Sequence, residues 1–321
     1  MTNIKKIGLT ALAGTLAATS AYAGALDVSG SASVKFSSLD TTEHTGNNYS
    51  MGQAITFAGS GDLDNGMAIS YSYTMTNAAF SNSSLKLDMG DMGSLSFAEG
   101  TSLAGIGAYR DKMPTAGEQV WDDLDGEANG HANFASNGTI GYNGSFGMMG
   151  VSASYNKNAS YTTENALGAI TATALDGSAF SVVLHAAPTD ESMVFYGIGE
   201  KSGADKNSGT DLYVVGGTYV MGGATVGIQQ TGVDVSATNG DMDRLHASAS
   251  FAVNENLSLS YGLSNVSFEN GTLVDQEDSG VAVSYTMGSM TLGGSWNQSD
   301  NVDGASGTDD THTEINLSFA F

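Results

Sequence analysis

Six carboxylates lie close together between residues 111 and 127 of this chain. Carboxylates at this density could bind a hard cation such as Ca²⁺, which takes several oxygen ligands, or could set a negative local potential. Their spacing does not match an EF-hand loop, so solvated charges that repel one another are at least an equal interpretation. The six are Asp111, Glu118, Asp122, Asp123, Asp125 and Glu127, and the last four are the calcium candidates.

Motifs for enzymatic chemistry are missing from the sequence. Gly-x-Ser-x-Gly and His-Glu-x-x-His do not occur, and the absence of Cys removes thiol nucleophiles, thiolate zinc sites and disulfides. No cofactor is required by any motif. The histidines are His44, His131, His185, His246 and His312, of which only His185 and His246 fall in predicted strands. Lone histidines of this kind are more often polar residues than catalytic ones, which leaves a hydrolase as the less favoured alternative.

The charge balance excludes one class of partner. Asp and Glu total 34 against 10 Lys and Arg, and two of the basic residues are Lys5 and Lys6. A protein that binds nucleic acid through phosphates needs a basic face, so no nucleic-acid partner is expected.

Residues 1–23 are typical of a secretory signal peptide. Lys5 and Lys6 precede a short apolar stretch, and Ala21-Tyr22-Ala23 fits the small-x-small cleavage pattern. The stretch is about a dozen residues long, too short for a spanning helix of about 20. We expect cleavage after Ala23, which leaves residues 24–321 as one domain outside the cytoplasm.

The rest of the chain alternates between apolar and polar residues with a period of two, which predicts strands with one apolar face. Sixteen segments follow this pattern, and the clearest is Ile315-Asn-Leu-Ser-Phe-Ala-Phe321. The connectors between them are alternately long and short, and only 2 prolines occur, both in connectors. Aromatic residues fall near strand ends in the apolar phase: Tyr49, Tyr71, Tyr73, Tyr155, Tyr219, Tyr261, Tyr285 and Trp296.

Two all-β architectures compete for this pattern. A soluble sandwich would bury the apolar faces in a core, whereas a transmembrane barrel turns them towards lipid and leaves small and polar residues lining a wet interior. The opposite faces are small and polar and include Lys35, Lys86, Arg244 and Glu314. The sequence therefore predicts a 16-stranded antiparallel transmembrane β-barrel, with short periplasmic turns, long extracellular loops and an aqueous interior.

The whole chain resembles the trimeric general porins of Gram-negative bacteria, especially those of alphaproteobacteria. The resemblance rests on the signal ending in Ala21-Tyr-Ala23, the turn Gly61-Asp-Leu-Asp-Asn-Gly66, the hairpin Asp88-Met-Gly-Asp-Met-Gly-Ser-Leu95, the long third loop and the ending at Phe321. It implies a bacterial outer-membrane location, a homotrimer, lipid and lipopolysaccharide as neighbours, and Phe321 as the signal read by the barrel-assembly machinery.

In such porins the third loop folds inward and narrows the pore, and basic residues on the wall face its acids. The resemblance implies this role for residues 100–138, which carry the six acids, with Lys35, Lys86, Arg110 and Arg244 as the basic side. Because the basic side is thin, we expect a passive, cation-preferring channel for small hydrophilic solutes. A substrate-specific channel for sugar, peptide or phosphate is the alternative. The loop lacks the Pro-Glu-Phe-Gly-Gly stretch of enterobacterial porins, and the short second loop at 76–82 leaves the trimer contacts unassigned.

Overall fold

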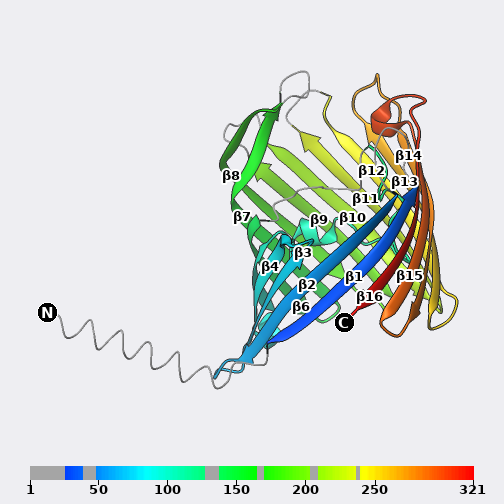
Figure 1. Ribbon diagram of the computed structural model, residues 1–321. Coiled ribbons are helices and arrows are strands. Elements are labelled where there is room, and N and C mark those ends of the chain that lie inside the picture. The colour runs from blue at the N-terminus through cyan, green and yellow to red at the C-terminus, as the bar shows by residue number, and fades with distance from the viewer. Residues whose placement is uncertain (1–25, 39–47, 127–136, 165–169, 203–208, 236–238) are drawn as a thin grey trace.

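The computed structural model describes residues 26–38, 48–126, 137–164, 170–202, 209–235 and 239–321. Within these residues the protein is a closed antiparallel β-barrel of sixteen strands with three short 3₁₀ helices (Figure 1). All sixteen predicted strands are confirmed. The elements are β1 (Asp27–Ser38), β2 (Tyr49–Asp62), β3 (Ala68–Thr76), β4 (Ala79–Asp88), η1 (Gly90–Met92), β5 (Ser94–Glu99), η2 (Ile106–Tyr109), β6 (Asn137–Phe146), β7 (Met149–Glu164), β8 (Ile170–Ala186), β9 (Ser192–Ser202), β10 (Thr210–Met221), β11 (Ala224–Val235), β12 (Met242–Ala252), β13 (Leu257–Phe268), β14 (Gln276–Met287), β15 (Met290–Asp300), η3 (Val302–Gly304) and β16 (Asp310–Ala320).

The barrel closes where β1 pairs with β16, in a register that sets Ser31 opposite Ala320. Two further backbone bonds extend this seam, because the Gly30 N–H donates to the Phe321 carbonyl at 2.6 Å and the Phe321 N–H donates to the Gly30 carbonyl at 2.9 Å. A Cβ at position 30 would lie 2.7 Å from the Phe321 ring, so a side chain there would require the ring to shift. No sheet edge is left open in the described barrel, as a bilayer requires.

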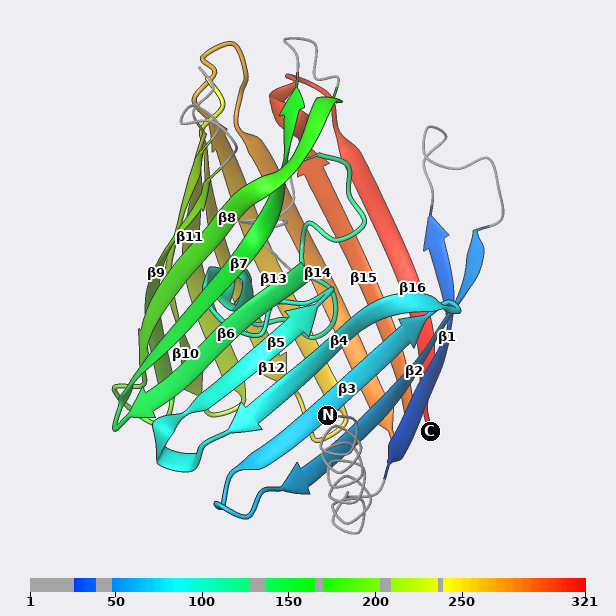
Figure 2. The same cartoon turned by 90° about the vertical axis from the view of Figure 1, so that its left-hand side faces the viewer.

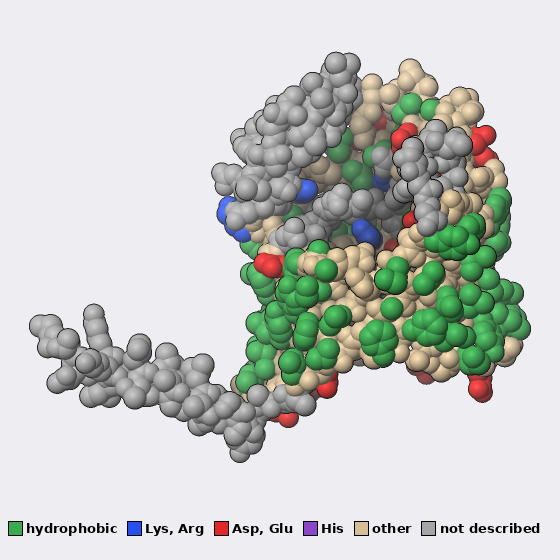
Figure 3. Space-filling view, in the orientation of Figure 1, with side chains coloured by type: hydrophobic (Ala, Val, Ile, Leu, Met, Phe, Trp, Pro, Cys, Tyr) green, Lys and Arg blue, Asp and Glu red, His purple; other side chains and the backbone are tan. Residues whose placement is uncertain are grey.

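The phase of the strands agrees with a membrane barrel. Apolar side chains such as Ile140, Ile228 and Leu263 are about half exposed on the outer wall, where Figure 3 shows a broad band of hydrophobic surface. Side chains of the opposite phase, such as Ser152 and Thr231, are buried inside the barrel. Outward aromatic residues accompany the band, including Tyr219, Tyr285 and Trp296. No helix in the described part of the chain is long and apolar enough to cross a membrane.

The strands run further than the alternation predicts. In the sequence, alternation stops at Tyr155 and resumes at Ala179, whereas β7 continues to Glu164 and β8 begins at Ile170. Alternation marks only the part of a strand that touches lipid. A ladder of backbone hydrogen bonds does not need that pattern, so strands can continue where alternation stops.

One side of the barrel is lower than the other. Strands β3, β4 and β5 have nine, ten and six residues, whereas β7 and β8 have 16 and 17 (Figure 2). The second loop is shorter than predicted, since only Asn77 and Ala78 separate β3 from β4 and both have positive φ. A two-residue turn of this kind matches the twist of a hairpin. The loop is therefore too short to reach outward over another molecule.

Candidate functional site

The segment after β5 lies inside the barrel, so the inward-folded third loop is confirmed (Figure 2). Residues 105–125 run along the inside of the barrel wall, and polar groups on seven of the strands form hydrogen bonds with them. These groups are Ser152 on β7, Ser181 on β8, Gln229 on β11, Ser248 on β12, Ser260 on β13, Asn297 on β15 and Asp310 on β16. The loop is thus fastened along its length and narrows the lumen.

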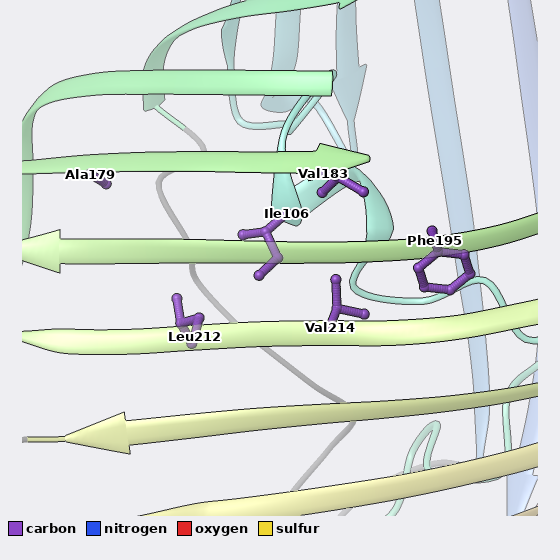
Figure 4. Packing of buried hydrophobic residues seen from close by; sticks show 6 residues of the cluster. All are labelled: Ile106, Ala179, Val183, Phe195, Leu212 and Val214. Carbon is purple, nitrogen blue, oxygen red and sulfur yellow. The ribbon is translucent and has the colours of Figure 1, made fainter. Parts of the chain in front are cut away.

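The loop begins at an apolar anchor. Ile106 is fully buried, and it packs between three neighbouring strands in a position that Figure 4 shows from close by. Around it lie Ala179, Val183, Phe195, Leu212 and Val214 on β8, β9 and β10. These inward side chains are exceptions to the polar lumen, and the loop removes them from water. Burial of an isoleucine contributes about 1.5–3 kcal/mol.

Gly105 allows the chain to enter this anchor. Its φ of +66° is readily adopted only by glycine, and a Cβ would lie within 2.3 Å of the hydroxyls of Ser181 and Ser154. The Gly105 N–H donates to Ser152 Oγ at 2.8 Å, and the Ile106 N–H donates to Ser181 Oγ at 2.9 Å. Two wall serines therefore hold the backbone on both sides of the turn.

The loop reaches an ionic anchor on the opposite part of the wall. The Lys35 ammonium on β1 lies 3.1 Å from Asp123 and 3.7 Å from Glu118 of the loop, and it also pairs with Glu314 of β16. Ser295 Oγ donates to Glu118 Oε2 at 2.6 Å. These four charged residues, Lys35, Glu118, Asp123 and Glu314, are called the Lys35 cluster below. They join the loop to the seam where the barrel closes.

The remaining acids occupy different environments. Asp111 accepts hydrogen bonds from Gln119 Nε2 and from the Met113 N–H, and Asp122 accepts one from the Gln119 N–H. Asp125 has an exposed side chain, while its N–H donates to Asp310. Glu127 lies outside the described residues.

The carboxylates that meet are not the predicted calcium set. The only group in the described chain with oxygens close enough to share an ion is Glu118, Asp123 and Glu314. The Lys35 ammonium already supplies positive charge there. Calcium binding stays a prediction.

The basic residues do not form one wall opposite the acids. Lys35 lies within its cluster, Lys86 faces the lumen from β4, and Arg244 is 3 % exposed on β12. Arg110 is exposed on the loop, and its neighbour Lys112 lies 4.9 Å above the Tyr109 ring. The bases on the loop therefore lie towards its apolar anchor together with Asp111, whereas Glu118 and Asp123 lie at Lys35.

Burial and pairing set the proton affinities of the loop acids differently. Burial raises the pKa of Asp111 and of Asp122 above the ordinary range. Burial would also raise the pKa of Asp123, but its hydrogen bond and attraction to Lys35 bring that pKa below the ordinary value. Burial lowers the pKa of Lys112.

The wall groups that hold the loop were not identified from the sequence, although their phase carried a signal. Ser152, Ser181 and Gln229 all lie in the inward phase, as do the apolar exceptions Val183 and Phe195. Large apolar residues that face a wet lumen mark a place where another segment covers them.

Three histidines, His185, His246 and His312, lie in described strands, and His312 Nδ1 on β16 lies 3.7 Å from Asp123 Oδ2. His185 and His246 face inward, and their rings contact Tyr109 and Trp121, at centroid distances of 5.7 and 4.7 Å.

Solved structures with this architecture include several bacterial porins. An anion-selective porin from Comamonas acidovorans matches with a TM-score of 0.66 and 15 % identity, over 93 % of this chain and 100 % of that one. The outer membrane protein OmpT of Vibrio cholerae, in a trimer form, matches with a TM-score of 0.65 and 14 % identity, over 93 % and 99 %. A mutant porin of Rh. blastica matches at 0.61 and 12 %, over 92 % and 100 %. At these identities the likeness shows the fold.

Sequence comparison gives the family. A search of curated proteins finds no match. The family model for Gram-negative porins matches residues 8–268, which is most of the chain. The sixteen-stranded barrel and the loop inside it agree with this match. The chain therefore belongs to the Gram-negative porin family and is an outer-membrane channel.

Proposed function

We propose that this porin is a water-filled pore for passive diffusion of small hydrophilic solutes and ions, and that it prefers cations. The observation that carries the proposal is the Lys35 cluster, in which three carboxylates share one ammonium at the loop. Between Arg110 and Gly126 the loop itself has five acids and two bases. A negative potential at the narrow part of a pore concentrates cations and repels anions.

The fold does not decide the sign of selectivity, since the Comamonas porin is described as anion-selective. The decisive measurement is the reversal potential of the purified protein in a planar bilayer with a potassium chloride gradient. We expect a potential of the sign given by potassium permeation. A potential of the opposite sign would refute cation preference while leaving the porin assignment untouched.

The selectivity should depend on pH in two stages. An ordinary aspartate has a pKa of about 3.9. Asp111 and Asp122 have raised pKa values, so they take up protons at a higher pH than that. Asp123 has a lowered pKa and stays ionised below that pH. Cation preference should therefore start to fall while most carboxylates are still charged, and part of it should persist. Reversal potentials recorded from neutral pH downwards test this, and the double variant Asp111→Asn, Asp122→Asn should lose the upper stage.

Two further expectations rest on the family. We infer a general rather than a specific pore, because polar wall groups such as Ser152, Ser260 and Asn297 are already bonded to the loop. Liposome swelling should then fall smoothly with solute size; a solute that enters faster than its size allows would favour the specific channel.

We also infer a homotrimer, as in the Vibrio protein, which three equal closing steps in single-channel records would report. Signal cleavage, lipopolysaccharide binding and recognition of Phe321 by the assembly machinery stay predictions.

A further inference from the structure

Methionines gather at the rim formed by the short turns. The chain has 14 methionines. Apart from Met1, nine of them lie in these turns or within two residues of them, whereas four lie elsewhere. Five of the nine have side chains more than half exposed: Met92, Met148, Met149, Met221 and Met287. We call these five the methionine rim.

The methionine rim lies closer to the turns than the outward tyrosines of the same strands. Tyr219 and Tyr285 are outward residues of β10 and β14, and Met221 and Met287 follow two positions later on the same face. Two residues of a strand span about 7 Å, so these thioethers lie that much closer to the turns than the phenol rings. Tyrosines mark the interface between the bilayer and water. The methionines therefore lie at headgroup level or in water.

Methionine differs from tyrosine at such a position in two ways. Its unbranched chain is apolar and flexible, so it can extend the lipid-facing surface when the bilayer is thick. Its sulfur can also be oxidised to a sulfoxide, which is polar and which reductases reverse. An aromatic residue at this level would offer neither property.

We propose that the methionine rim is a site of reversible oxidation that sets the height of the lipid-facing band on the turn side. With hydrogen peroxide as oxidant, a lone pair of the sulfur attacks one peroxide oxygen and the O–O bond breaks. The sulfur gains that oxygen and is oxidised by two electrons; the proton of the attacked hydroxyl moves to the other oxygen, which leaves as water. Each sulfoxide replaces an apolar side chain by a polar one, which shortens the apolar band from its periplasmic border.

The first test maps oxidation residue by residue. The folded protein in phosphatidylcholine vesicles is treated with hydrogen peroxide, and sulfoxide is quantified by peptide mass spectrometry. Rim residues should oxidise at least about tenfold faster than Met113, which is 5 % exposed beneath the loop. Equal rates at the rim and at Met113 would overturn the proposal.

The second test measures the consequence for membrane seating. Oxidised and untreated protein are unfolded by heat in vesicles of dilauroylphosphatidylcholine, which are thin, and of dioleoylphosphatidylcholine, which are thicker. Oxidation should lower the unfolding temperature in the thicker vesicles and change it little in the thin ones, because only the thicker bilayer reaches the rim. An equal change in both, or no change in either, would contradict the proposal.

A variant separates the rim from other sites. Met92→Leu, Met148→Leu, Met149→Leu, Met221→Leu and Met287→Leu together keep the rim apolar and remove its oxidisable sulfurs. Met51, which is 68 % exposed at the opposite rim, remains in both proteins and controls for oxidation elsewhere. After peroxide treatment the Leu variant should keep its unfolding temperature in thicker vesicles. If it loses as much as the wild type, the effect arises outside the rim.

Discussion

Lys35→Met should make the pore more cation-selective and its current noisier. The substitution removes the ammonium that three carboxylates share, and their oxygens lie within 4.8 Å of one another. A permeating ion interacts with one unit charge about 8 Å away in water by about 0.5 kcal/mol. We therefore expect relative cation permeability to rise about twofold. Repulsion among Glu118, Asp123 and Glu314 should also release this end of the loop. Planar-bilayer recordings report both effects.

The stability of the barrel should fall as well. Removing one partner of a fully buried ion pair costs about 3–5 kcal/mol, but Lys35 is 32 % exposed, so we expect about 1–3 kcal/mol in the free energy of unfolding. Lys86→Met is the matched control. It removes the same charge from a lumen-facing residue that has no ion pair with any described residue. It should raise cation preference without added noise or loss of stability. If the two variants behave alike, the Lys35 cluster does not fasten the loop.

Ile106→Ala should loosen the other end of the constriction. The substitution leaves a cavity among Val183, Phe195 and Val214, and truncation of a buried isoleucine costs about 2–5 kcal/mol. That cost falls mainly on docking of the loop, because the barrel ladder does not depend on it. We expect brief excursions to higher conductance and faster proteolysis of the loop, with little change in the barrel's unfolding temperature.

Leu103→Ala provides the control for this loop. Leu103 precedes the anchor in the same segment, but it is 37 % exposed and lies outside the apolar cluster. Its truncation should leave conductance steady. Equal noise in both variants would mean that the loop is held by the hydrogen bonds of its backbone and not by Ile106.

The barrel could be predicted because a bilayer imposes a simple pattern. Each spanning strand needs an apolar residue at every second position, so segments such as Leu257–Leu263 reveal both their existence and their orientation. Strand ends beyond the lipid carry no such demand, which is why β7 and β8 were predicted too short.

The Lys35 cluster could be predicted only in part. The inward direction of Lys35 followed from its apolar neighbours Val34 and Phe36. Its partner Glu314 depends on how β1 meets β16, a register that is set when the barrel closes and not by either strand alone. The role of Ile106 was missed because one apolar residue in a loop has no period. The available signal was the inward direction of Val183 and Phe195, which are large apolar residues that face the lumen and pack against Ile106.

The seam between β1 and β16 also has a kinetic consequence. Ser31 pairs with Ala320, so the contact that removes the final sheet edges joins residues from nearly opposite ends of the chain. Contacts of such long sequence separation carry a high loop-closure entropy and form slowly. Until this ladder forms, β1 and β16 expose two unpaired strands that can add further strands, including those of another copy. Assembly of this porin is therefore most vulnerable to aggregation just before closure, when almost every other contact is already made.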